Sequence, residues 1–552
     1  MSVTVIFNLA MTTRDGVKLY ADVYLPAPTG KFPLIVLRSP YNSDTPGYSQ
    51  YCADFCEQGI GVVCQAVRGT AVSEGEMNVS SQECDDGEDF LEWIAAQDFC
   101  NGNIVTNGES YPGHTQWQVA RHAHPVLKGT TPHNAPLDFY PVAMRPGGAW
   151  GFGLATIWAF GVRSRRCHLT QKTPWKDAQW HLPLKTMDEV VLGEEWPLWR
   201  KWMEHVCRDE FWQGKSDAFS DIEKMTAPAF ITGGWFDAFL PQTLEAFAAL
   251  RKHGATEQVR NFTRCVIEPL DHDMRTHEVD YGPDHLAGII ETRNRFMKER
   301  LFSPDKDPLP EQPPIRFFVM GSNRWMDADE WPLPQTVYTK MYLHGASPAN
   351  TATWAGQLED WVPFGMEPAD HFIYNPLQPV PTQGGNNLGF IAPGQRLQEE
   401  IEKRADVLVY TSAPMSKDTD MIGHVTALIY AATDGFDTDF TVKICDVSPD
   451  GKSYNICDGL KRGRFLQGTD KERLLEPNRV YPYEIDCWYT AWTFLKGHCI
   501  RVQVSSSNFP RFDRNLNTGM HLTESSEMRV AFQTVYHDMQ YPSCVILPII
   551  PS

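Results

Sequence analysis

The first 138 residues alternate short apolar runs with segments of helical periodicity. Residues 17–25 largely alternate apolar and polar side chains, which is typical of an antiparallel edge strand. The next runs are compact, rich in β-branched residues and followed by turns. Such continuous apolar strands, alternating with helices, indicate a parallel sheet covered on both faces. The predicted strands are 32–37, 61–65 and 104–107, and the predicted helices are 49–58 and 85–97.

The alternation stops between residues 139 and 221, in a helix-like segment crowded with tryptophan. It holds eight of the 17 tryptophans in the chain and is typical of a lid inserted into a sheet domain. We expect most of these rings to form the core of the lid and a few to face a substrate cavity, because ligand pockets are largely apolar and aromatic. The candidate substrate-binding residues are Trp150, Trp158 and Trp175, with Trp235 and Phe239 from the segment that follows.

Strand and helix alternation then resumes, with strands at 228–232, 264–268 and 315–320 and a helix at 240–252. From about residue 336 onward, helical periodicity is scarce and Pro and Gly turns separate many strand-like runs, which indicates an antiparallel sandwich or jelly roll. The sequence therefore predicts an α/β fold in three parts. These are a catalytic sheet domain (1–138 and 222–335), a helical cap (139–221) and a jelly-roll domain (336–552).

Composition and charge exclude several classes of protein. With 42% hydrophobic and 12% aromatic residues, the chain is expected to fold rather than to be disordered. Its 49 basic and 69 acidic residues give a net charge of −20, so a nucleic acid would be repelled. The longest uncharged, mainly apolar stretch, residues 146–162, contains five glycines and is too short to span a membrane.

The N-terminal residues lack a signal-peptide pattern, and the 13 cysteines are scattered without a C-x-x-C motif. We therefore expect a cytoplasmic protein with neither a zinc site nor a redox dithiol, and without nucleic-acid or membrane partners. The sequence leaves its oligomeric state open, a homodimer included.

The sharpest local motif is Gly108-Glu-Ser-Tyr-Pro-Gly113, between the strand 104–107 and a helical run at 115–123. A serine on a sharp strand-to-helix turn needs small neighbours, which the two glycines supply. The N-terminus of the following helix favours a developing negative charge. By itself the string also fits an ordinary glycine-rich turn, and its strand–turn–helix context is what favours Ser110 as a nucleophile.

A serine nucleophile needs a base and an acid that orients the base. On a doubly wound sheet these follow the serine in the order acid, then histidine, each just after a strand. Strand 228–232 leads into Gly233-Gly-Trp-Phe-Asp237, and strand 264–268 leads into Pro269-Leu-Asp-His272. The order and the topology together predict Asp237 as the orienting acid and His272 as the general base.

Other acids and histidines lie near these positions in the sequence. Asp271 and Asp273 compete with Asp237, but the immediate neighbours of a histidine in an extended loop rarely reach its Nδ1 atom. His114 and His122 follow the serine closely, yet both lie on the helix behind it and are expected to point elsewhere.

Further motifs are spread along almost the whole chain, and the last of them is long and unlike any generic hydrolase motif. They are Arg14-Asp-Gly-Val-Lys-Leu19, Ser39-Pro-Tyr-Asn42, Arg68-Gly69 with Ser73-Glu-Gly75, Asp86-Gly-Glu-Asp89 through Trp93, Gly108 through Trp117, Gly234-Trp-Phe-Asp237, Asn323-Arg-Trp325 with Glu330-Trp-Pro-Leu333, and Ser505-Ser-Ser-Asn-Phe-Pro-Arg-Phe-Asp-Arg-Asn515. In this set the chain resembles the family of serine hydrolases that contains the cocaine esterases, the X-Pro dipeptidyl-peptidases, the α-amino-acid ester hydrolases and the glutaryl acylases.

The resemblance implies an α/β-hydrolase domain, an inserted helical cap and a C-terminal jelly roll, in agreement with the three parts above. It also implies an oxyanion hole formed by the phenol hydroxyl of Tyr41 and the backbone N–H of Tyr111. A phenol hydroxyl can donate in a dry pocket without adding a net charge. From the residues alone Tyr41 is only a tyrosine in a turn. No metal and no organic cofactor is implied.

Three positions depart from the family pattern. Ala66 replaces the usual Asp before the Arg68-Gly69 pair, so a salt bridge of the family could be missing. The histidine loop, Glu268 to His272, lacks the usual glycine and tryptophan, which changes the wall of the pocket. Glu109 places a carboxylate where the family often has an apolar residue. It could tune His272 or bind a cationic group, but we expect a buried, hydrogen-bonded structural role.

These observations predict a serine hydrolase that cleaves an ester or amide of a small acyl substrate through an acyl-serine intermediate. The alternatives within the enzyme class are an acyltransferase and an X-Pro-type peptidase on the same triad. A non-catalytic binding protein on this fold is the least expected, because all three triad positions are occupied. The sequence does not identify the acyl group or the leaving group.

Overall fold

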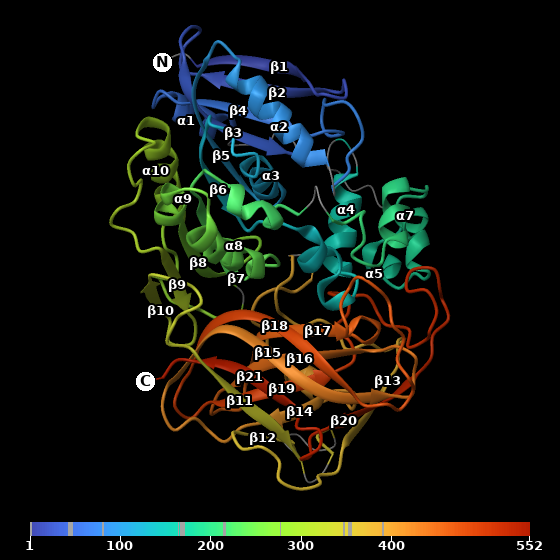
Figure 1. Cartoon of the computed structure of the whole chain (residues 1–552). Coiled ribbons are helices and arrows are strands. Elements are labelled where there is room, and N and C mark those ends of the chain that lie inside the picture. The colour runs from blue at the N-terminus through green and yellow to red at the C-terminus, as the bar shows by residue number, and fades with distance from the viewer. Residues whose placement is uncertain are drawn as a thin grey trace.

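The computed structural model describes residues 3–41, 48–79, 82–163, 165, 172–213, 217–276, 278–345, 348–350, 356–388 and 391–551. Figure 1 shows an N-terminal sheet with its helices at the top and a C-terminal body of strands at the bottom, with short helices of the intervening segment beside both. Within these ranges, no helix has the length and apolar character needed to cross a membrane.

The N-terminal sheet has ten strands in the order β1-β2-β4-β3-β5-β6-β7-β8-β9-β10. The strands from β4 to β9 run parallel to their neighbours, and the antiparallel pairs lie at the two edges. The strands are β1 Thr4–Thr12, β2 Lys18–Leu25, β3 Phe32–Ser39, β4 Gly61–Ala66, β5 Cys100–Glu109, β6 Leu127–His133, β7 Phe230–Phe236, β8 Arg264–Asp271, β9 Ile315–Val319 and β10 Arg324–Ala328.

Helices cover both faces of this sheet, as the continuous apolar strands predict. Successive residues of a strand point to opposite faces, so Leu34 and Val36 of β3 pack with Phe90 of α2, whereas Ile35 packs with Met297 of α10. The helices of this domain are α1 Tyr48–Cys56, α2 Gln82–Ala95, α3 Tyr111–Ala120, α8 Leu240–His253, α9 Glu257–Phe262 and α10 Ile289–Phe302.

The order of the parallel strands switches between β3 and β5, because the chain continues from β3 to β4 on one side and places β5 on the other. In open α/β sheets, ligand sites lie outside the carboxyl ends of the strands at such a switch point. Ser110 follows β5 directly and Tyr41 follows β3 by two residues. The topology therefore brings the predicted nucleophile and the predicted oxyanion donor to one end of the sheet.

The segment between β6 and β7 consists of short helices packed around aromatic rings. Trp150, Trp199, Trp202 and Trp212 are buried in its hydrophobic cluster. We call this segment the cap; its elements are η1 Tyr140–Met144, η2 Pro146–Gly148, η3 Phe152–Thr156, α4 Ile157–Val162, α5 Trp175–Ala178, η4 Leu184–Thr186, α6 Met187–Val191, α7 Pro197–Glu204 and η5 Phe219–Lys224.

The C-terminal domain is an eleven-stranded, largely antiparallel sheet in the order β13-β20-β15-β21-β11-β12-β14-β19-β16-β17, with β18 paired to β15. It also carries the short helices α11 Glu399–Glu402 and η6 Gly463–Phe465. That its strands are connected as a jelly roll stays a prediction. The strands are β11 Val337–His344, β12 Gly356–Glu359, β13 Asp370–Tyr374, β14 Leu408–Thr411, β15 Thr419–Thr433, β16 Asp439–Val447, β17 Ser453–Arg462, β18 Tyr481–Phe494, β19 Cys499–Ser505, β20 Ala531–Tyr536 and β21 Cys544–Ile549.

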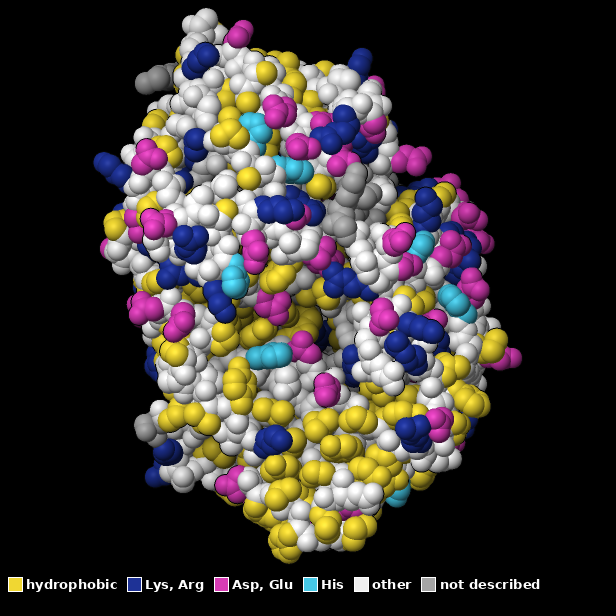
Figure 2. Space-filling view, in the orientation of Figure 1, with side chains coloured by type: hydrophobic (Ala, Val, Ile, Leu, Met, Phe, Trp, Pro, Cys, Tyr) yellow, Lys and Arg dark blue, Asp and Glu magenta, His cyan; other side chains and the backbone are white. Residues whose placement is uncertain are grey.

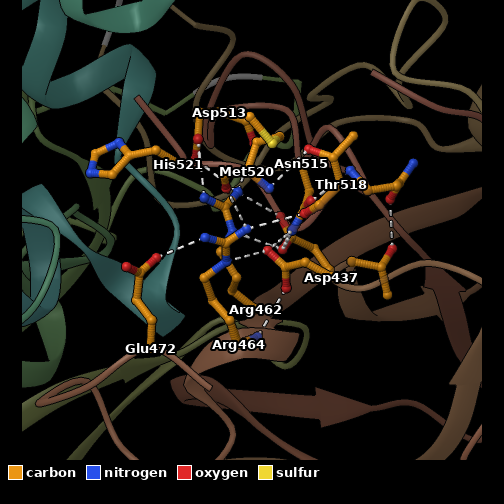
Figure 3. Close-up of polar contacts among 12 residues, drawn as sticks. Asp437, Arg462, Arg464, Glu472, Asp513, Asn515, Thr518, Met520 and His521 are labelled. Carbon is orange, nitrogen blue, oxygen red and sulfur yellow. Dashed lines mark hydrogen bonds and ion pairs between the residues drawn. The ribbon is translucent and has the colours of Figure 1, made fainter. Parts of the chain in front are cut away.

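A buried network of charges joins the cap to the C-terminal domain (Figure 3). Arg462 is wholly buried and donates to both oxygens of Asp439, at 2.9 and 2.8 Å, and to both oxygens of Asp513, at 3.1 and 3.0 Å. The same Asp513 carboxylate accepts the backbone N–H of Trp150 in the cap at 2.7 Å. Asp513 belongs to the long motif at 505–515, so part of that motif fixes the cap.

Charged side chains of both signs are interspersed over the face shown in Figure 2, and apolar side chains gather toward the C-terminal domain. Although the chain has a net charge of −20, the acidic side chains on this face do not form one continuous patch. Although Ala66 replaces the family's acid, Arg68 pairs with Asp86 at 2.6 Å and with Asp15 at 2.8 Å.

Candidate active site

Ser110 occupies the sharp turn between β5 and α3. Its φ of 62° lies in the left-handed region, which is strained for a residue with a side chain. A Cβ atom on Gly108 would lie 2.5 Å from the Cβ atom of Pro112, and one on Gly113 would lie 2.4 Å from that of Ala135. Only glycine fits at these two positions, which is the physical reason for the glycines that flank the serine.

His272 and Asp237 reach the serine from the ends of the neighbouring strands. His272 Nε2 lies 3.1 Å from Ser110 Oγ, and His272 Nδ1 lies 2.5 Å from Asp237 Oδ2. Asp237 is fully buried, and its other oxygen accepts the backbone N–H of Phe239 at 2.7 Å. When Nδ1 donates to Asp237, Nε2 is left as the acceptor for the serine proton.

Three of the four competing residues, Asp271, His114 and His122, have other partners. Asp271 Oδ1 accepts the backbone N–H of Arg275 at 2.8 Å. His114 contacts the carbonyl of Pro136 at 3.0 Å behind α3, where burial lowers its pKa to about 4. His122 contacts the carbonyl of Cys84 at 2.9 Å.

The electrostatics of the site favour a charged imidazole. Burial opposes the positive charge on His272. The charge and hydrogen bond of Asp237, together with the charges of Glu109 and Asp273, outweigh burial and raise the pKa of His272 above its ordinary value. A base whose conjugate acid is stabilised in this way is suited to accept a proton from a hydroxyl group.

Tyr41 lines a cavity of about 560 Å³ together with Ser110 and His272. Its hydroxyl oxygen accepts the indole N–H of Trp158 at 3.0 Å. The phenol of Tyr111 instead points into the protein, where it donates to Glu83 at 3.0 Å. The backbone N–H of Tyr111 is the first of α3 and has no acceptor within the helix.

The predicted substrate-binding aromatics divide into two groups. The ring of Phe239 meets His272 edge-on at 5.4 Å between centroids, and Trp158 stacks on Tyr111 at 5.6 Å, so both lie beside the triad. Trp175 packs on Phe152 of the cap, further along the same aromatic cluster.

Trp150 and Trp235 are a correction to the sequence analysis, because they are only 0% and 2% exposed and have no surface to offer a substrate. The indole N–H of Trp150 donates to Thr156, and that of Trp235 donates to the carbonyl of Phe318. The sequence analysis assigned both rings to the substrate cavity, because an aromatic pattern by itself does not separate the rings of a core from the rings of a pocket.

Asn386 is a residue that the sequence analysis missed. Its side-chain amide donates to the carbonyls of Trp235 and Asp237, both at 2.9 Å, and so holds the loop that carries the triad acid. Its only signal in the sequence is a glycine pair, Gly384 and Gly385, which both adopt positive φ. That signal predicts a turn and gives no indication of a partner about 150 residues away.

The part of the chain that the structure describes contains no cluster of metal-ligating side chains. No group of three or more His, Cys, Asp or Glu side chains there could hold a metal ion.

Comparison with known proteins gives matches along almost the whole chain. Cocaine esterase from Rhodococcus sp. (strain MB1 Bresler) is 34% identical over 98% of both chains. Residues 15–273 match the family model of the X-Pro dipeptidyl-peptidase (S15 family), and residues 310–546 match that of the X-Pro dipeptidyl-peptidase C-terminal non-catalytic domain.

Solved structures share the fold. An aminopeptidase from the marine sediment archaeon Thaumarchaeota archaeon has a TM-score of 0.84 at 23% identity and covers 100% of this chain and 97% of its own. An α-amino acid ester hydrolase has a TM-score of 0.82 at 21% identity and covers 99% of this chain and 96% of its own. The arrangement of sheet, cap and C-terminal strands is therefore a known one, and the identity to cocaine esterase shows that the chain belongs to the cocaine-esterase and X-Pro dipeptidyl-peptidase-like family of serine hydrolases.

Proposed function

We propose that the protein hydrolyses an ester or amide of a small acyl group through a covalent ester on Ser110. The observation that carries the proposal is the continuous contact from Ser110 Oγ to His272 Nε2 and from His272 Nδ1 to Asp237 Oδ2, beside a cavity. This is the geometry that a nucleophile, a base and an orienting acid require.

In the first step Ser110 Oγ forms a bond to the carbonyl carbon while His272 Nε2 takes the serine proton. Asp237 stabilises the imidazolium that results. Tyr41 and the N–H of Tyr111 donate to the oxyanion, and each such donor stabilises the transition state by about 3 kcal/mol. The N–H of Trp158 on the Tyr41 oxygen polarises the phenol and so strengthens it as a donor.

In the second step the bond to the leaving group breaks and His272 returns its proton to the departing alcohol or amine. Water, activated by the same base, then hydrolyses the acyl-enzyme. Transfer to another alcohol or amine and cleavage of an X-Pro peptide use the same steps, and they differ only in the groups that the pocket admits. Product analysis with an added nucleophile and with an X-Pro peptide separates these alternatives from ester hydrolysis.

A cytoplasmic location forms part of the proposal. None of the twelve cysteines in the described ranges forms a disulfide bond, and ten of them are buried. Free thiols in this number are typical of a reducing compartment.

The test of the acyl-enzyme uses a fluorophosphonate, which reacts only with an activated serine. We expect the full-length protein to gain one adduct, located at Ser110 by peptide mass, and the variant Ser110→Ala to gain none. Labelling that persists in Ser110→Ala contradicts the proposal, because another residue is then the reactive nucleophile. A folded wild type that stays unlabelled also contradicts it and favours a binding protein on this fold.

The pH dependence of hydrolysis follows from His272, which must be neutral to act as a base. Activity is lost as pH falls through the pKa of this residue in the folded protein, and that pKa is raised above 6.5. We expect the acid limb of kcat/KM for a neutral ester to have its midpoint above pH 6.5. A midpoint at or below 6.5 would show that the carboxylates around His272, of which Asp237 contributes most, do not outweigh burial in stabilising the imidazolium.

A further inference from the structure

A buried carboxylate holds the residue that carries one of the two proposed oxyanion donors. Glu83 lies on α2 and is only 1% exposed. Its Oε1 atom accepts the phenol hydroxyl of Tyr111 at 3.0 Å and the side-chain amide of Gln82 at 2.9 Å. Its Oε2 atom lies 3.0 Å from Nη2 of Arg38. The mechanism proposed above makes no use of this carboxylate.

The charge of Glu83 is balanced by Arg38. Burial raises the pKa of Glu83, and the positive charge of Arg38 is the largest influence that opposes this rise. Arg38 is itself 3% exposed, and its Nε atom donates to Oε1 of Gln65 at 2.8 Å. Two buried charges of opposite sign are stable only beside each other, so each of these side chains fixes the position of the other.

The ion pair joins the two segments that carry the proposed oxyanion donors. Arg38 is on β3, three residues before Tyr41. The backbone carbonyl of Arg38 also accepts the hydroxyl of Thr115 at 3.1 Å, and Thr115 lies on α3, which begins at Tyr111. Tyr111 is therefore connected to the end of β3 in two ways, through the side chain of Glu83 and through α3.

The backbone at Tyr111 needs such an anchor. Ser110, directly before it, has a φ of 62°, which is a strained conformation that the surroundings must maintain. An oxyanion donor is effective only when its N–H lies about 2.7–3.1 Å from the place where the negative charge develops. Because the Tyr111 side chain is 1% exposed and its hydroxyl points to Glu83, that hydroxyl can affect the reaction only through the backbone.

We propose that Glu83 is a positioning residue of the oxyanion hole. By holding the phenol of Tyr111 it fixes the backbone N–H of the same residue, and by pairing with Arg38 it keeps this N–H in place relative to the end of β3, where Tyr41 follows. The inference rests on the proposed acyl-enzyme function and adds a residue to its machinery. It predicts that a hydroxyl group remote from the substrate contributes to the rate of the chemical step.

The experiment compares 4-nitrophenyl acetate with its thionoester, in which sulfur replaces the carbonyl oxygen. Sulfur is a weaker hydrogen-bond acceptor than oxygen, so the thionoester gains less from the donors of the oxyanion hole. A displaced donor therefore lowers kcat for the ester more than kcat for the thionoester. Damage to the triad lowers both values alike, because both substrates need the same nucleophile and base.

The variant Tyr111→Phe removes only the hydroxyl and leaves the pair of Glu83 and Arg38 intact. We expect kcat for the ester to fall about tenfold, with KM within about twofold of the wild type and kcat for the thionoester within about threefold. The control is Tyr374→Phe in the C-terminal domain. Tyr374 is also 1% exposed and its hydroxyl also donates at 3.0 Å, to the carbonyl of Asn515, so the same substitution there should keep the wild-type values.

A second variant tests Glu83 itself. The double substitution Arg38→Met with Glu83→Leu removes the carboxylate without leaving a buried arginine unpaired. We expect it to lower kcat for the ester about as much as Tyr111→Phe does. Adding Tyr111→Phe to it should then lower kcat by less than about twofold more, because the phenol no longer has a carboxylate to hold it. Circular dichroism checks folding, and if the double variant does not fold, the ratio of ester to thionoester kcat in Tyr111→Phe decides alone.

The remaining outcomes separate this inference from the proposed function. Wild-type kcat in Tyr111→Phe, or equal losses for the ester and the thionoester, overturns the positioning role and leaves the acyl-enzyme mechanism standing. A full loss on adding Tyr111→Phe to the double variant shows that the phenol acts without Glu83, which also overturns the inference. A wild type that hydrolyses neither substrate and stays unlabelled by the fluorophosphonate removes the acyl-enzyme mechanism, and the positioning role with it.

Discussion

The variant Asp237→Asn should lower kcat about 10⁴-fold while the protein stays folded. The reason is the hydrogen bond that the other carboxylate oxygen accepts from the backbone N–H of Phe239 at 2.7 Å. Because that N–H requires an acceptor, the asparagine must keep its oxygen there and turn its NH₂ group toward His272 Nδ1. The imidazole then carries its proton on Nε2, where it can no longer accept the proton of Ser110.

The measurement is kcat for an activated ester, with far-ultraviolet circular dichroism as the check on folding. Asp273→Asn is the matched control, because Asp273 is the neighbouring acid on the histidine loop and lines the cavity. We expect it to lower kcat less than about tenfold, since it makes no hydrogen bond to the imidazole in the structure. A larger loss of kcat in Asp273→Asn than in Asp237→Asn would show that Asp273, and not Asp237, orients the imidazole.

The variant Asp513→Ala should lower the free energy of unfolding by about 3–5 kcal/mol. Asp513 is 6% exposed and neutralises Arg462, which has no exposed surface. Without this carboxylate, Arg462 loses one of the two ion pairs that it forms with described residues, and the backbone N–H of Trp150 loses its acceptor. A buried charge that has lost a partner lowers the free energy of unfolding by more than the intact ion pair raised it.

Urea denaturation, followed by tryptophan fluorescence, measures this effect as a lower midpoint. The control is Glu476→Ala, which removes one side of an ion pair between side chains that are 59% and 70% exposed, Arg479 and Glu476. Exposed pairs contribute little, so we expect no resolvable change in the midpoint. Equal midpoints for Asp513→Ala and the wild type would show that the network in Figure 3 does not hold the cap in place.

The triad could be predicted because each of its residues follows a strand that is recognisable on its own. Ser110, Asp237 and His272 lie just after β5, β7 and β8, and a parallel sheet brings the carboxyl ends of such strands to one edge. Strict local requirements, such as the small residues that flank Ser110, mark these positions in the sequence itself.

The lining of the site could not be predicted in the same way. Trp150 and Trp235 were predicted to bind substrate, but core residues and pocket residues are aromatic alike, and the structure leaves only 0% and 2% of them exposed. For Glu109 the sequence predicted a buried structural role, whereas the structure leaves 43% of its side chain exposed in the lining of the cavity.

By itself, then, the sequence determined the α/β fold with its C-terminal strand domain and predicted that Ser110, His272 and Asp237 meet, since these depend on local strand and turn preferences and on one rule of sheet topology. Only the tertiary structure decided which aromatic rings border the site, that Asn386 of the C-terminal domain supports the loop of Asp237, and that Asp513 fixes the cap. These contacts join residues about 150 to 360 positions apart, and no local pattern encodes which of many apolar or polar groups will meet at that distance.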